Sequence, residues 1–61
     1  MRYDIYRRQN EEWKLAAVTD ERIMAVHQAK MYYEVDRERY IKHGVKIWDN
    51  EEKRWCYMRE C

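Results

Sequence analysis

Several residue types on which many functions depend are scarce or missing in this 61-residue chain: serine, proline and phenylalanine are absent, and glycine and threonine occur once each. Without serine and with a single threonine, a hydroxyl nucleophile and a Ser-His-Asp triad are nearly excluded. One glycine is too few for a phosphate-binding loop or a dinucleotide-binding fingerprint. Because no cluster of Pro, Gly or Ser occurs, we expect no linker and a chain ordered nearly from end to end. These absences predict a protein that is not an enzyme.

Long hydrophobic runs and an excess of one charge are missing as well. No apolar run is longer than four residues, the length of residues 23–26, which is far short of a membrane span, and no secretion signal is evident, so we expect a cytoplasmic protein. Thirteen basic and 12 acidic residues give a formal net charge of +1, which removes the usual electrostatic argument for a dedicated nucleic-acid-binding protein. A chain of this length predicts one small domain, residues 1–61, with a thin core.

Metal and cofactor sites find little support in the two cysteines and two histidines. Cys56 and Cys61 are separated by four residues, which is not a zinc-binding spacing. His27 and His43 are not placed as a pair, and neither has a nucleophile near it in the sequence. We therefore predict no metal and no cofactor, free thiols as in a reducing cytosol, and histidines that are structural or solvent-exposed.

The segment between Thr19 and Gly44 carries helix signals at both ends. Thr19 can cap a helix and is followed by two acidic residues, while Lys42 and His43 come just before the glycine, which suits a left-handed C-terminal position. These signals predict a helix over residues 20–43, with an early break near Gln28 as the alternative. At 100° per residue, the main stripe of the helix consists of Met24, Gln28, Met31, Tyr32, Val35 and Arg39, with Ala25 and Ala29 beside it, and a second, weaker stripe consists of Val26, Tyr33 and Tyr40.

Two pairs of strand-like segments flank this helix. Residues 3–8 and 13–18 enclose the polar stretch 9–12, and residues 45–49 and 54–58 enclose the polar stretch 50–53, so each pair is typical of a hairpin. The order strand, strand, helix, strand, strand predicts an α+β fold, in which one long helix packs on one face of a small antiparallel sheet of two hairpins.

Strand alternation predicts which side chains share a face of the sheet. With turns of even length, Trp48 lies opposite Trp55. One face is then predicted to carry Trp48, Trp55 and Tyr57 from the second hairpin, and the other face Val45, Ile47, Cys56 and Met58. In the first hairpin, one face is predicted to carry Tyr6, Trp13, Leu15 and Ala17. The other face is predicted to carry Tyr3, Ile5, Ala16 and Val18. Both faces are apolar, the alternation does not decide which of them the helix covers, and a single helix leaves one uncovered.

An uncovered aromatic face is the feature that points to a function. Trp and Tyr together supply nine residues, as many as Val, Ile and Leu, and such an aromatic surplus is typical of a surface that meets a partner. We therefore expect a non-enzymatic protein-binding module, an inhibitor or adaptor that occludes its partner protein, and a homodimer. The predicted binding residues are Trp48, Trp55, Tyr57, Trp13 and Tyr6, with Arg37, Arg39 and Lys42 as a basic rim.

Two other functions compete with this interpretation. The same sheet face with the basic helix end is compatible with binding single-stranded RNA or DNA, by stacking of bases and contact with phosphates, although the acidic turns would repel phosphate. A purely structural homo-oligomer is the other alternative. In its size, near-neutral charge and aromatic surplus, the chain resembles small phage or mobile-element accessory proteins that block a host machine, a resemblance that implies an inhibitor but involves no specific residues.

Overall fold

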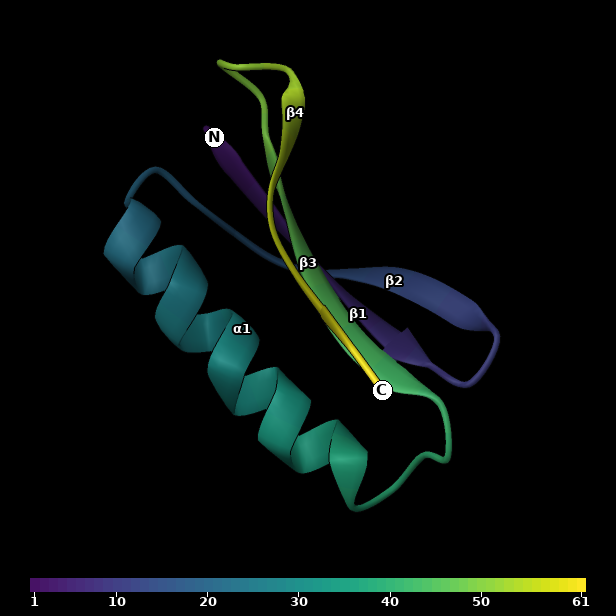
Figure 1. Cartoon of the computed structure of the whole chain (residues 1–61). Coiled ribbons are helices and arrows are strands. Elements are labelled where there is room, and N and C mark those ends of the chain that lie inside the picture. The colour runs from purple at the N-terminus through teal and green to yellow at the C-terminus, as the bar shows by residue number, and fades with distance from the viewer.

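The computed structural model describes residues 1–61 and contains five elements. Strands β1 (Tyr3–Gln9) and β2 (Glu12–Thr19) precede helix α1 (Arg22–Arg37), and strands β3 (His43–Asp49) and β4 (Arg54–Glu60) follow it. The strands form one antiparallel sheet in the order β2-β1-β3-β4, and α1 lies along one face of that sheet (Figure 1). The predicted α+β fold of two hairpins and one helix is confirmed. The helix is neither long nor apolar enough to cross a membrane.

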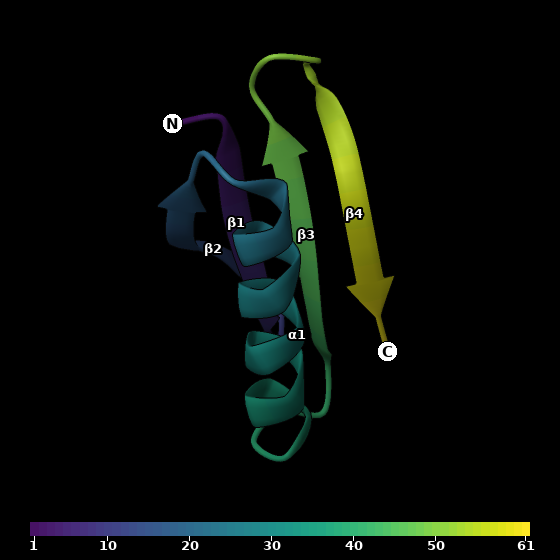
Figure 2. The ribbon, with the colours of Figure 1, turned by 90° about the vertical axis from the view of Figure 1, so that its left-hand side faces the viewer.

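The core lies between α1 and the two central strands, β1 and β3. In Figure 2 the helix lies in front of these strands. Its buried side chains come from alternate positions of β1 and β3 and from one side of the helix, where two alanines allow close approach. The core residues are Tyr3, Ile5, Ala25, Ala29, Tyr33, Val45 and Ile47. Only one face of the sheet is covered in this way.

The helix is shorter than predicted and ends at Arg37, next to Asp36, whose side chain and backbone carbonyl both make hydrogen bonds there. Arg7 of β1 donates from Nε to Asp36 Oδ2 at 2.9 Å and from Nη2 to Oδ1, which raises the pKa of Arg7. The backbone carbonyl of Asp36 accepts hydrogen bonds from the N–H groups of Arg39 and Tyr40, closing the last turn. The predicted C-terminal residue His43 lies in β3 instead, and no break occurs at Gln28.

The helix start and its buried side also differ from the prediction. Glu21 is the N-terminal flanking residue, and the Thr19 hydroxyl, two residues earlier, accepts a hydrogen bond from the Glu21 N–H at 3.2 Å. Ala25, Ala29, Tyr33 and Asp36 are the buried residues of the helix, and the two alanines allow it to approach the sheet closely. Of the predicted stripe, Tyr32 packs against the core, whereas Met24, Met31 and Val35 are exposed.

A β-bulge in the first hairpin changes which residues of β2 share a face. Ile5 is paired with Ala17, but Tyr6 is paired with Leu15, so Ala16 is an extra residue without a partner. Ala17 therefore faces the helix and Val18 faces away from it, the reverse of the predicted arrangement. Tyr6, Trp13 and Leu15 share a face, as the alternation predicts.

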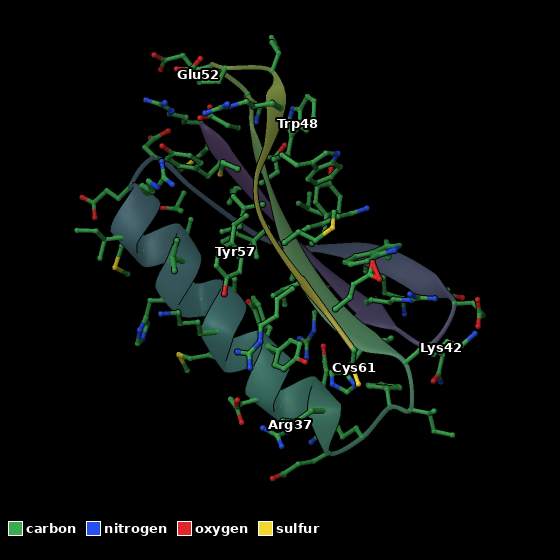
Figure 3. The ribbon with its side chains drawn as sticks, viewed as in Figure 1. Arg37, Lys42, Trp48, Glu52, Tyr57 and Cys61 are labelled. Carbon is green, nitrogen blue, oxygen red and sulfur yellow. The ribbon has the colours of Figure 1, made fainter.

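A second bulge has the same effect in the other hairpin. Trp48 is paired with Trp55, but Ile47 is paired with Tyr57, so Cys56 is the extra residue. Tyr57 therefore packs toward the core, and Figure 3 shows it pointing to α1 while Trp48 lies on the other side of the sheet. The prediction that Tyr57 shares a face with the two tryptophans is wrong. Met58 moves correspondingly to the face away from the helix.

The turn between β3 and β4 is held by a buried carboxylate at Asp49. Asp49 accepts hydrogen bonds from Arg2 Nε and Nη2, both at 3.1 Å, and its Oδ1 also accepts the N–H groups of Glu51 and Glu52 at 2.9 and 3.2 Å. The hydrogen bonds from Arg2 are the main reason that the pKa of Asp49 falls to about 2.

Unfolding in acid should report this site. Because the pKa of Asp49 in the folded protein is below its usual value of 3.8, ionised Asp49 stabilises the fold above about pH 4, and this contribution is lost as the pH falls toward 2. Urea denaturation at a series of pH values should show the free energy of unfolding decreasing over this window. In Asp49→Asn the decrease should be shallower, and an unchanged slope would contradict the assignment.

Candidate interaction surface

The face of the sheet opposite α1 carries no covering element, and we call it the open face (Figure 1). Strand alternation and the two bulges decide its composition. Leu15 is 56% exposed, Met58 55% and Trp55 42%. The open face consists of Asp4, Tyr6, Arg8, Trp13, Leu15, Val18, Gly44, Lys46, Trp48, Trp55, Met58 and Glu60.

Three aromatic rings form a connected cluster on this face, with Trp55 in the middle. Its ring centroid lies 5.6 Å from that of Tyr6 and 5.0 Å from that of Trp48, and both interplanar angles are 71°. Edge-to-face pairs of this kind are favourable and hold the rings in fixed orientations. The cluster therefore offers a rigid, amphipathic surface built from β1, β3 and β4.

Lys46 joins the fourth aromatic residue, Trp13, to this cluster. Its Nζ lies 4.1 Å from the centre of the Trp13 ring and 4.5 Å from that of Trp55, within the range of cation–π contacts. Gly44 makes room for this arrangement, because a Cβ there would lie 3.2 Å from Trp13 Cη2 and 3.0 Å from the Arg59 carbonyl oxygen. This close approach, rather than a helix C-terminus, is the role of the single glycine.

The structure brings together four of the predicted site residues and separates the others. Tyr6, Trp13, Trp48 and Trp55 lie on the open face, whereas Tyr57 packs toward the helix. Lys46, Met58 and Val18 are open-face residues that were not among the predicted site residues. Lys46 could have been placed on this face from the sequence, because it lies two residues from Trp48 in the same strand and alternate residues share a face.

The residues of the predicted basic rim lie outside the strands that form the open face. Arg37 ends α1, on the other side of the sheet, and Lys42 lies in the connection to β3, as Figure 3 shows. Lys42 Nζ lies 2.7 Å from Glu11 Oε1, a contact that lowers the pKa of Glu11, and Arg37 lies 3.4 Å from Glu34. Two of the three predicted cations are therefore already paired, and only Arg39 has no carboxylate partner.

Other reactive groups are dispersed. Cys56 is half-buried and Cys61 is exposed, both as free thiols. His43 is buried, with its Nδ1 3.2 Å from the Tyr40 carbonyl oxygen and its ring edge-on to Tyr33 at 5.0 Å. The molecule has no pocket and no group of three or more His, Cys, Asp or Glu residues placed to hold a metal ion.

Comparison with known proteins finds no matching family, curated protein or solved structure.

Proposed function

We propose that the chain is a non-enzymatic cytoplasmic protein-binding module, an inhibitor or adaptor of the phage or mobile-element accessory type, that occludes a surface of its partner protein with the open face. The observation that supports this proposal is the cluster of Tyr6, Trp48 and Trp55, with Trp13 beside it, on a sheet face that no other element covers. Tryptophan and tyrosine dominate the binding energy of many protein interfaces.

The energetics of this surface favour a bound state. Apolar area in contact with water costs about 25 cal/mol per Å², and monomeric proteins rarely expose large contiguous apolar patches. The rings are already held by edge-to-face contacts, so little side-chain entropy is lost when a partner covers them. A protein surface of complementary shape would bury the whole cluster at once.

Single-stranded nucleic acid is the second candidate, because Lys46 lies between two tryptophan rings on which bases could stack. The position of the basic residues argues for a protein instead. A nucleic-acid complex needs several free cations beside the stacking platform, whereas Lys42 and Arg37 are paired with Glu11 and Glu34. Salt dependence of binding separates the two candidates.

A homodimer is the other way to cover the open face, and the sequence predicts one at micromolar concentration. Pairing two open faces would join their apolar residues into one continuous core. Light scattering over a range of concentrations measures this association. A dimer formed through the open face would dissociate in Trp55→Ala but persist in Met31→Ala, a variant of an exposed helix residue. A monomer well above micromolar concentration would exclude self-association and leave the open face to a foreign partner.

Affinity capture from a lysate of the cells that naturally contain the protein, followed by mass spectrometry, tests the main proposal. The wild type and Met31→Ala should retain the same partner protein, and Trp55→Ala should lose it while keeping the wild-type circular dichroism spectrum. If Met31→Ala loses the partner and Trp55→Ala keeps it, binding involves the helix, and the proposal is wrong.

A further inference from the structure

Lys46 is the one cation of the open face that has no carboxylate partner. Arg8, the other cation on this face, lies 3.5 Å from Glu60 and 3.8 Å from Glu11. The remaining open-face carboxylate, Asp4, accepts a hydrogen bond from Asn50 Nδ2 at 3.0 Å. The positive charge of Lys46 is therefore balanced only by the faces of Trp13 and Trp55.

The two tryptophan rings give Lys46 the properties of a prepared binding site for an anion. They hold its ammonium group near the middle of the apolar cluster, so that little side-chain entropy remains to be lost. A partner that covers the cluster also removes water from Lys46, and an ammonium group without a counter-charge is costly in such an environment. A carboxylate on the partner would remove this cost, because ion pairs strengthen as the surroundings lose water.

We propose that the partner presents an aspartate or glutamate side chain, flanked by apolar residues, whose carboxylate binds Lys46 Nζ between Trp13 and Trp55. This inference rests on the proposed function of the open face. The flanking apolar residues then pack on Leu15 and Met58, the most exposed apolar side chains of this face. A second copy of the chain fits less well, since a two-fold pairing centred on the cluster brings the Lys46 residues of both copies toward each other.

A random peptide library displayed on phage provides a probe that needs no knowledge of the natural partner. Selection on the wild-type protein should yield peptides in which Asp or Glu is flanked by aromatic or aliphatic residues. Selection on Lys46→Met should yield apolar peptides without acid enrichment. Lys14→Met is the matched control, because Lys14 is an exposed lysine next to Trp13 on the opposite side of β2, and it should select the same peptides as the wild type.

A double-mutant cycle then tests the contact itself. Replacing the acid of a selected peptide by its amide should weaken binding to the wild type about tenfold or more, as for other desolvated charge pairs. The same replacement should change binding to Lys46→Met about twofold or less, because the cation is then missing. An equal loss in both proteins would overturn the inference.

The outcomes distinguish this inference from the proposed function. Peptides that need Trp55 but lack an acid would disprove the carboxylate contact and leave the open face as a protein-binding surface. Peptides that bind without Trp55 would disprove both. If oligo(dT) binds in a Lys46-dependent manner and no acidic peptide does, the anion is a phosphate, and both the protein partner and the carboxylate are excluded.

Discussion

Replacing Asp36 by asparagine should lower the free energy of unfolding by about 3 kcal/mol, the lower end of the range for breaking a buried ion pair. The Asp36 side chain is completely buried, whereas that of Arg7 remains 21% exposed, so part of the guanidinium can be rehydrated. The loss is still large because Arg7 would remain charged against the Tyr32 ring, 4.4 Å away, without its counter-charge. Urea denaturation measures the difference.

A matched control separates this effect from the general loss of a carboxylate. Glu34 lies on the same helix, is exposed and pairs with Arg37 three residues later, so Glu34→Gln should cost about 0.5 kcal/mol or less. The double variant Arg7→Met/Asp36→Leu should recover most of the stability, because an apolar pair of similar volume often replaces a buried ion pair without loss. If Asp36→Asn costs no more than Glu34→Gln, the pair does not hold the helix to the sheet.

The helix could be predicted from the sequence, but its end could not. The signals in Thr19–Gly44 are local, and they indicate a helix between two hairpins correctly. His43 and Gly44, predicted at the helix end, pair instead with Gln9 and Arg8 across the sheet, and Arg7, which is distant in the chain, binds Asp36 and holds the helix end to that sheet. The conformation of His43 and Gly44 is therefore decided by a strand partner, β1, that lies outside the segment carrying the helix signals.

The candidate surface shows the same division between local pattern and long-range structure. Strand alternation predicts the shared face of Trp48 and Trp55 because their pairing next to the turn is set by turn length. Beyond Trp55, the extra residue Cys56 exchanges the faces of Tyr57 and Met58, and Ala16 does the same for Ala17 and Val18. Nothing in the residue types at these positions indicates a bulge, since alanine and cysteine fit either face.

Truncating the aromatic cluster should have the largest effect on binding. Trp55 contacts Tyr6, Trp48 and Lys46 at once, so Trp55→Ala removes the centre of the surface and should weaken binding to the partner by about 2 kcal/mol or more, as hot-spot truncations do. Trp48→Ala should cost a similar amount. Isothermal titration calorimetry with the captured partner, and thermal melts to confirm that each variant folds, provide the measurement.

The charged residues outside the open face decide between the two classes of partner. The triple variant Arg37→Ala, Arg39→Ala, Lys42→Ala should keep most of its affinity for a protein partner, because none of the three lies in a strand of the open face and two of them are already paired. The affinity should also change little between about 50 and 200 mM salt, since charges at the edge of a protein interface mainly affect the association rate. A nucleic-acid complex releases counterions, so its affinity falls steeply with salt. A steep salt dependence, combined with a greater loss in the triple variant than in Trp55→Ala, would therefore assign the open face to single-stranded nucleic acid.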